Sequence, residues 1–317
     1  GGYWGWDPVE NSSLVPWLVS LILVHGLLIQ QRKNVLQRLN IILALLYFIL
    51  VFYSTYLTRS GILSNFSVHS FSATKSSSFL LYFLLLTFFI SFILIIIRSI
   101  KMNSSPFSET FFSWERISFH GLLVLLIFSA IVLLGTSFPI ISTFLGNPQS
   151  VKPAKYNEIS QLFAILILLF MSISFIVLNK KQHNWKSILA LVCISLGMGI
   201  FFNYGYNQFI IATAISAASF FLIVFHIYEF LSNYSLQFIL PRMIHMGVAI
   251  LFLGIISSNV HTYAEKKEVY ENQPAKVTNI DLTFKGLTKE QFSKALFTIS
   301  KGKQNVHIQT PYFYDTA

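Results

Sequence analysis

The sequence predicts an all-α polytopic membrane protein, with about eight transmembrane helices and a small, mostly β, C-terminal extramembrane domain. Of its 317 residues, 54% are hydrophobic and only 11% are charged, whereas soluble domains carry roughly 25% charged residues. Apolar runs close to the length of about 20 residues that spans a bilayer recur as far as residue 259. Beyond that point the composition becomes polar.

Eight apolar runs are the candidate transmembrane helices, with ends defined to within about 2–4 residues. They are Ser13–Gln30, Leu39–Leu57, Phe79–Ile97, Ile117–Leu134, Ile159–Leu178, Ile188–Phe202, Phe209–Leu231 and Met243–Asn259. The first is expected to begin at an N-cap among Asn11, Ser12 and Ser13, with Pro16 in its first turn.

The net charge of +10 raises the possibility of nucleic-acid binding. The basic residues gather instead in alternate short loops, which is the positive-inside pattern of a membrane protein. These residues are Arg32, Lys33 and Arg38, then Arg98, Lys101 and Arg116, then Lys180, Lys181 and Lys186, then Arg242. We therefore expect no nucleic-acid partner, and we assign these loops to the cytoplasm or matrix.

This orientation places both ends of the sequence outside. The predicted parts are an external segment (1–18), a transmembrane bundle (13–259) and an external C-terminal domain (260–317) that we expect to be truncated. The last part alternates polar and apolar residues in VTNIDLTF and NVHIQ, as strands do. The single cysteine, Cys193, lies in an apolar run, forms no disulfide within this sequence, and is expected to be a small core residue.

The first eighteen residues, GGYWGWDPVENSSLVPWL, crowd aromatic side chains around glycines and prolines. Glycine lets a backbone approach a flat surface closely, and Trp and Tyr present rigid apolar faces. Such a segment at the end of a membrane helix suits a large planar ligand. The alternative is an interfacial aromatic belt, which needs no ligand.

The order G-G-Y-W-G-W-D-P-V-E-N-S-S resembles the tryptophan-rich WWD signature of haem-handling membrane proteins, and more narrowly the CcmF-like family of cytochrome c haem lyase subunits. That family carries a Trp before the paired glycines, so we expect an N-terminally incomplete chain. The resemblance implies that this segment binds haem through Gly2, Tyr3, Trp4, Trp6, Asp7, Pro8, Glu10, Asn11 and Trp17.

Four histidines, at positions 25, 120, 226 and 245, lie near inner helix ends. Ionisable groups within a bilayer are costly and often functional, but depth alone leaves six possible pairs of haem ligands. The resemblance selects His25, in LVHGLL, and His245, in RMIHMGVAILFLGI, as ligands of a haem b iron. His120 and His226 match no motif and are interpreted as structural.

The loop from T-R-S-G to V-H-S-F resembles a second motif of the family. The resemblance implies that His69 ligates the iron of the haem being attached, and that Arg59 could bind a haem propionate. A solvated loop histidine and a plain interfacial arginine are the alternatives. The family's second external histidine lies upstream, and we do not expect His261 to replace it. His183 and His307 are interpreted as loop or tail residues.

The resemblance implies a haem lyase activity, in which thioether bonds form between haem and the C-x-x-C-H segment of apocytochrome c. The residues implied to be catalytic are His69, Trp4, Trp6 and Asp7. The implied partners are haem, a CcmE-like haem chaperone, apocytochrome c, CcmH-like subunits and membrane lipid, in a bacterial or mitochondrial inner membrane. A haem carrier or exporter of the CcmC or CcsA type is the alternative function, and an unrelated solute transporter is a third.

Overall fold

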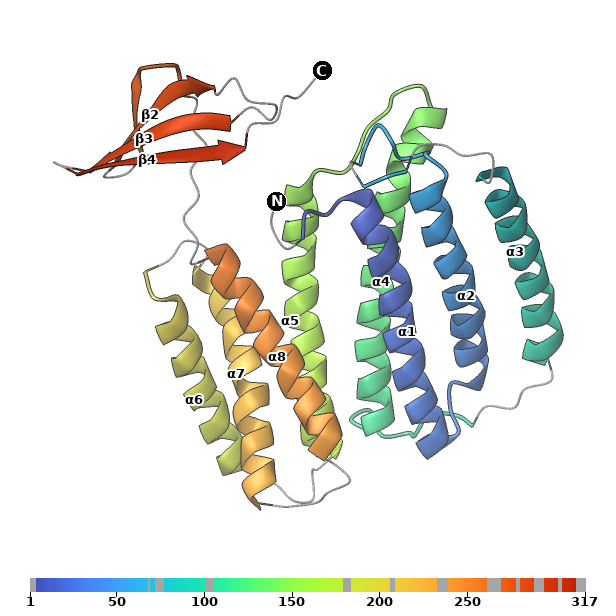
Figure 1. Cartoon of the computed structure of the whole chain (residues 1–317). Coiled ribbons are helices and arrows are strands. Elements are labelled where there is room, and N and C mark those ends of the chain that lie inside the picture. Colours follow the sequence, from blue (N-terminus) through green and yellow to red (C-terminus); the bar gives the residue numbers. More distant parts are fainter. Residues whose placement is uncertain are drawn as a thin grey trace. The chain divides into compact units, whose positions relative to one another are not determined.

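The computed structural model describes residues 4–67, 69–71, 77–100, 105–178, 184–205, 209–232, 239–260, 269–277, 280–287, 294–301 and 304–311. The chain divides into two compact units, Gly1–Val260 and His261–Ala317. The first unit is helical and the second is a small sheet (Figure 1). The predicted fold class is therefore confirmed.

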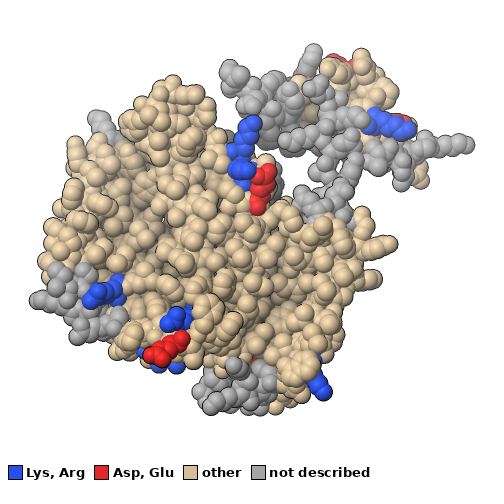
Figure 2. Space-filling view, turned by 180° about the vertical axis from the view of Figure 1, so that it is seen from behind, with Lys and Arg blue, Asp and Glu red and all other residues tan. Residues whose placement is uncertain are grey.

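Eight helices of the described residues are long and apolar enough to cross a membrane. They are α1 (Pro8–Lys33), α2 (Gln37–Arg59), α3 (Ser77–Ile100), α4 (Trp114–Phe144), α5 (Pro153–Leu178), α6 (Trp185–Asn203), α7 (Phe209–Ser232) and α8 (Ile239–Val260). On the face shown in Figure 2, the described charged side chains of this unit lie toward the helix ends, and a broad uncharged band separates them. This distribution is typical of a protein surrounded by lipid, and the chain is a membrane protein.

The first helix begins earlier than predicted. Asp7 is its N-cap and accepts the N–H of Val9 at 2.8 Å, Glu10 completes a capping box, and Pro8 occupies the first helical position. The prediction of an N-cap among Asn11, Ser12 and Ser13 was wrong, and Pro16 lies inside the helix. Asn11, Ser12 and Ser13 therefore lie inside the helix, because the capping box of Asp7 and Glu10 precedes them.

The fourth helix also exceeds its predicted range, because it continues past Pro139 to Phe144. Proline within a membrane helix is tolerated where hydroxyl groups and neighbouring helices satisfy the freed backbone. Here α4 packs on α1 and α5. In its last turn, the hydroxyl groups of Ser142 and Thr143 donate to the carbonyl of Pro139, at 3.0 and 2.7 Å.

The helices form two groups, and each group has its own buried core. In the first, α1 packs on α2 and α4, with Val19, Leu43 and Val132 buried between them. In the second, α7 packs on α5, α6 and α8, around Leu168 and Leu222. Contact between α4 and α5 joins the groups. As a result, α1 and α8 belong to different groups.

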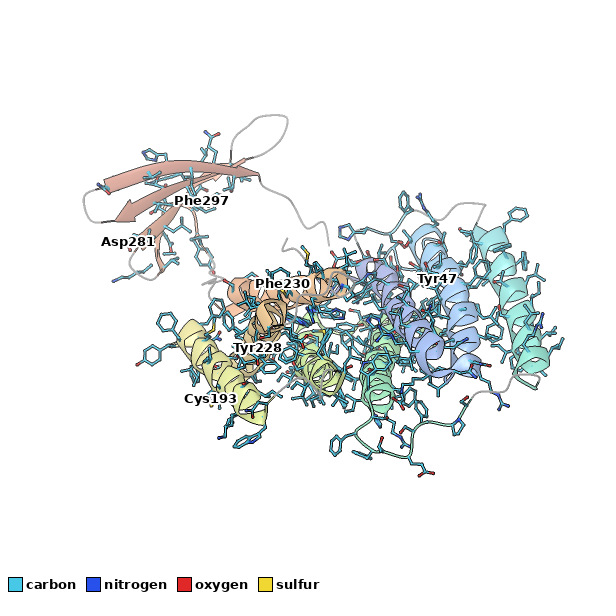
Figure 3. All side chains as sticks on the ribbon, turned by 90° about the horizontal axis from the view of Figure 1, so that it is seen from below. Tyr47, Cys193, Tyr228, Phe230, Asp281 and Phe297 are labelled. Atoms are coloured by element: carbon cyan, nitrogen blue, oxygen red, sulfur yellow. The ribbon has the colours of Figure 1, made fainter. Side chains whose placement is uncertain are left out.

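The contact between α6 and α7 depends on small and polar residues, as membrane helix interfaces often do. The buried Asn203 amide donates to the hydroxyl of Ser216 at 3.1 Å and to the carbonyl of Gly199 at 3.0 Å. Cys193 also lies on α6, but its side chain is exposed (Figure 3), so the prediction of a small core residue was wrong. A short apolar run in a membrane helix does not reveal which face meets lipid.

The second unit is a four-stranded antiparallel meander, in the order β1 (Pro274–Val277), β2 (Ile280–Leu287), β3 (Lys294–Lys301) and β4 (Gln304–Pro311). Its register shifts between Phe284 and Gly286, where Gly286 has a φ of 112° that only glycine adopts easily. The predicted β character of the C-terminal part is confirmed.

We predict that Gly199→Ala destabilises the helical unit by about 1–3 kcal/mol, because overpacking has nowhere to relax. An added Cβ would lie 2.9 Å from both the backbone N and the Cβ of Ala217 on α7. Unfolding in mixed detergent micelles would measure this change. The matched control is Gly197→Ala, two residues away, where a Cβ meets nothing within 4 Å; equal losses in the two variants would contradict the prediction.

Candidate functional site

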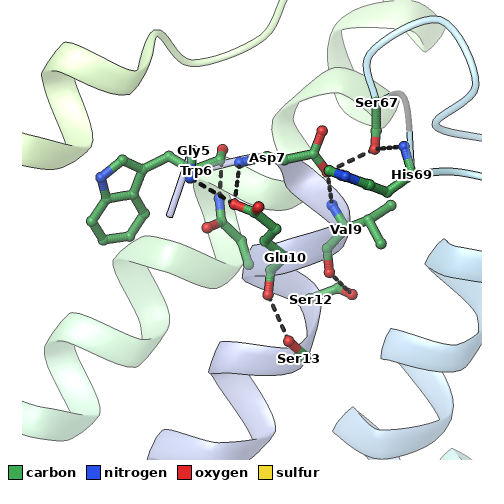
Figure 4. Close-up of polar contacts among 10 residues, drawn as sticks. Gly5, Trp6, Asp7, Val9, Glu10, Ser12, Ser13, Ser67 and His69 are labelled. Carbon is green, nitrogen blue, oxygen red and sulfur yellow. Dashed lines mark hydrogen bonds and ion pairs between the residues drawn. The ribbon is translucent and has the colours of Figure 1, made fainter. Parts of the chain in front are cut away.

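The residues before α1 fold back onto its first turn. The N–H of Gly5 donates to Glu10 Oε2 at 2.9 Å, and the buried Asn11 amide donates to the carbonyl of Trp6 at 3.1 Å (Figure 4). Trp6 has a φ of 56°, which is uncommon for a residue other than glycine. Charged and amide side chains of the helix thus fix the backbone that carries the two tryptophans.

Trp6 is anchored to α5. Its indole Nε1 donates to Asn157 Oδ1 at 2.6 Å, and its ring stacks on Tyr156 with centroids 4.9 Å apart and planes at 7°. Trp4 meets Trp6 edge-on, with centroids 6.1 Å apart. Tyr156 and Asn157 were missed by the sequence analysis, since nothing in the local pattern of α5 links them to a segment about 150 residues earlier.

A cleft of about 190 Å³ opens beside the tryptophan segment. It is lined by Gly5, Trp6, Asp7, Pro8, Phe66, Gly135, Pro139, Ser150, Val151, Pro153 and Tyr156. Pockets for drug-sized ligands are larger, about 300–1,000 Å³. A ligand as large as a porphyrin would therefore place only an edge in this cleft.

The structure brings the second motif to the start of α1. Ser67 donates its hydroxyl to Asp7 Oδ1 at 2.6 Å and accepts the backbone N–H of His69 at 3.1 Å (Figure 4). His69 Nδ1 lies 3.7 Å from the same carboxylate oxygen, and 56% of its side chain is exposed. Asp7 and His69, which come from motifs about sixty residues apart, thus form one polar group. Ser67 was not identified from the sequence.

The other predicted outer residues are more dispersed. The Arg59 guanidinium lies 4.1 Å from the centre of the Phe71 ring, in the loop that holds His69. Trp17 is 54% exposed and lies further along α1, outside the stack of Trp4, Trp6 and Tyr156. Gly2 and Tyr3 lie outside the described residues.

His25 and His245 face each other although α1 and α8 belong to different helix groups. Their ring centroids are 6.1 Å apart and their planes are at 82°. Each Nδ1 bonds to a carbonyl one turn back on its own helix, His25 to Leu21 at 2.8 Å and His245 to Pro241 at 2.6 Å. A carbonyl only accepts, so each Nδ1 carries the proton and each Nε2 keeps the lone pair that binds metal.

The spacing of this pair fits a shared metal ion. Two imidazoles that bind one ion from opposite sides, at about 2 Å each, have ring centroids about 6 Å apart. Within the described part of the chain, no three His, Cys, Asp or Glu residues gather to hold a metal without further ligands. An iron that brings four ligands of its own needs only two protein ligands, which is what this pair offers.

The remaining histidines have other surroundings. His226 is buried and meets Phe175 at a centroid distance of 4.4 Å, and Phe175 in turn meets His245 at 4.9 Å. His120 bonds through Nδ1 to the carbonyl of Arg116 at 2.6 Å. His307 bonds to Thr298 within the sheet. His183 and His261 lie outside the described residues.

We predict that Trp6→Ala lowers the thermal stability of the purified protein, since the substitution removes a hydrogen bond worth about 1 kcal/mol and a stack worth about 0.5–1.5 kcal/mol. Trp6→Phe keeps a stacking ring and is expected to lose less. Trp17→Ala is the control because that side chain is exposed. Trp6→Ala and Trp17→Ala proteins of equal stability would refute the anchoring role.

Comparison with known proteins gives concordant matches. Residues 1–64 match the family model described as cytochrome C assembly protein. The chain is 28% identical to the cytochrome c-type biogenesis protein CcmF of Pseudomonas fluorescens over 326 aligned positions, covering 96% of this chain and 48% of the relative. It is 36% identical to CycK of Bradyrhizobium diazoefficiens over 177 positions, covering 53% of this chain and 26% of the relative.

A solved structure, the cytochrome c haem lyase CcmF, has the same fold. It superposes with a TM-score of 0.63 at 21% identity, covering 98% of this chain and 50% of the solved chain. The chain thus spans about half the length of the curated relatives it matches over most of its own length. The resemblance to CcmF-like proteins that the motifs indicated is confirmed.

Proposed function

We propose that this chain acts in cytochrome c maturation as part of a haem lyase, which holds haem at the outer membrane face and joins it to the C-x-x-C-H segment of apocytochrome c. The observation that carries the proposal is the pairing of His25 and His245 at 6.1 Å with both Nδ1 atoms bonded to backbone carbonyls. The similarity to CcmF over most of the chain supports it.

The inner pair would hold a resident haem b. Each imidazole would present Nε2 to the iron, while its backbone bond fixes the tautomer and the ring direction. A haem bound there would supply one-electron transfer, with a potential set by its axial ligands. Gly26, beside His25, lets α2 approach closely, because a Cβ at this position would overlap the buried Asn40. This contact fixes the height of His25 along the bundle.

The outer residues would hold the substrate haem. His69 would ligate its iron, Trp4 and Trp6 would contact the porphyrin edge at the cleft, and Arg59 would pair with a propionate. The chain's one cysteine lies on α6, so both sulfur atoms of the thioether bonds would come from the substrate. Positioning of two reactants can supply about 7–11 kcal/mol toward a barrier, which suits a site without a nucleophile of its own.

The proposed setting is a bacterial or mitochondrial inner membrane, with the tryptophan segment and the sheet unit on the outer side. The positive-inside pattern of the loops supports this orientation. The proposed partners are a CcmE-like haem chaperone that delivers haem, apocytochrome c that receives it, and CcmH-like subunits.

We predict that His25→Ala and His245→Ala each remove most of the low-spin haem absorbance of the purified protein, because one remaining imidazole cannot give six-coordinate iron with two protein ligands. The control is His120→Ala, whose imidazole makes the same kind of backbone bond. Undiminished low-spin haem in both test variants would end the inner-haem proposal.

We predict that His69→Ala abolishes cytochrome c formation while leaving the inner haem spectrum unchanged. Covalent haem on the apocytochrome, detected after denaturing electrophoresis, would be measured beside haem capture by the membrane protein. If the wild-type protein captures haem but does not support cytochrome c formation, the chain acts instead as a haem carrier.

A further inference from the structure

The structure links the tryptophan segment to His69 through a single serine. The Ser67 hydroxyl has one donor and two acceptor positions. It uses the donor toward Asp7 Oδ1 at 2.6 Å and one acceptor toward the His69 N–H at 3.1 Å. The Ser67 residue is 7% exposed. A buried hydroxyl with both kinds of bond used holds the backbone of the loop at a defined place.

Asp7 Oδ1 is the common acceptor of this arrangement. It receives the Val9 N–H at 2.8 Å and the Ser67 hydroxyl at 2.6 Å, and His69 Nδ1 lies 3.7 Å away. The distance to Nδ1 is too long for a direct hydrogen bond and short enough for electrostatic attraction. The bonds to a charged acceptor are of the stronger, charge-assisted kind.

The side chains of Asp7 and His69 differ in their exposure to solvent. The Asp7 side chain is 16% exposed and that of His69 is 56% exposed. A largely covered carboxylate therefore supports an imidazole that is open to an approaching ligand. In metal sites, the loss of a residue that orients a ligating histidine typically costs 10–100-fold in affinity, and here the orienting contact is the bond from the His69 N–H to Ser67, which Asp7 holds.

We propose that Ser67 and Asp7 are positioning residues, which hold the His69 imidazole in the direction required to ligate haem iron. The inference rests on the proposed function, because it assigns His69 the role of iron ligand. It changes the expected role of Asp7, which acts through Ser67 and His69 rather than by touching haem.

The test uses the full chain carrying His25→Ala, so that added ferric haem reports on the outer site. Haem is titrated into the purified protein and the Soret absorbance is followed. Ser67→Ala is expected to weaken haem binding about 10–100-fold, while Ser67→Thr, which keeps a hydroxyl, binds like the parent. The matched control is Ser13→Ala, since Ser13 is an exposed serine whose hydroxyl donates to the Glu10 carbonyl of its own helix.

A second measurement does not depend on haem. Carbethoxylation of His69 by diethylpyrocarbonate, followed by peptide mass spectrometry, reports how the imidazole is held. Ser67→Ala is expected to change the rate several-fold, with Ser67→Thr again like the parent. Asp7→Asn keeps an oxygen that can cap α1 but loses the charge, so its effect separates the carboxylate's role at His69 from helix capping.

The outcomes are distinguishable. If Ser67→Ala matches Ser13→Ala in both measurements while His69→Ala loses haem, the positioning role is wrong and the proposed function stands. If His69→Ala binds haem as tightly as the parent, His69 is no iron ligand and both proposals fail at the outer site. Weakened binding and altered reactivity in Ser67→Ala, rescued in Ser67→Thr, support the inference.

Discussion

The start of α1 depends on one carboxylate oxygen that serves two purposes. Asp7 Oδ1 caps the helix through the N–H of Val9 and holds the loop of the second motif through Ser67. Caps of this kind contribute about 1 kcal/mol to a helix, so capping alone does not require an aspartate where serine or asparagine would serve. The additional bond to Ser67 explains why an aspartate occupies this position, because a full negative charge strengthens both the capping bond and the bond to Ser67.

The lipid environment explains the inner pair. An imidazole within a bilayer is costly unless it is satisfied or bound. His25 and His245 each satisfy one nitrogen on their own helix, and their ring centroids lie 6.1 Å apart between the two helix groups. Water in that position would solvate the second nitrogen at little cost, whereas lipid would not. The membrane setting therefore supports the proposal that a ligand lies between the two rings.

Much of this architecture could be predicted from the sequence, because a bilayer imposes a simple rule of length and hydropathy. All eight helices of the described residues follow that rule. The predictions were wrong where local hydrogen bonds or helix packing, and not length and hydropathy, determined the structure. The cap at Asp7 extended α1, and α4, which packs on α1 and α5, continued past Pro139. The exposure of Cys193 depends on which face of α6 meets lipid, which an apolar run does not encode.

Residues of the candidate site could be predicted from the sequence where they lie in motifs. They could not be predicted where only packing brings them to the site. Asp7 and His69 lie in recognisable motifs, and the structure brings them together. Tyr156 and Asn157 lie in no motif, and Ser67 lies in the loop of the second motif without being one of the residues that identify it. The roles of all three arise from contacts between segments distant in the chain. A hydroxyl or an amide is common in any loop, and only the three-dimensional arrangement shows what it bonds to.

Both candidate haem sites share α1, and this has a mechanical consequence. Asp7 and His25 are eighteen residues apart, which corresponds to about 27 Å along a helix. One end is fixed by the cap and by the anchoring of Trp6 to Asn157, and the other by the contact of Gly26 with Asn40. Because a helix is stiff along its axis, these contacts set the separation between Asp7, which holds the outer loop, and His25.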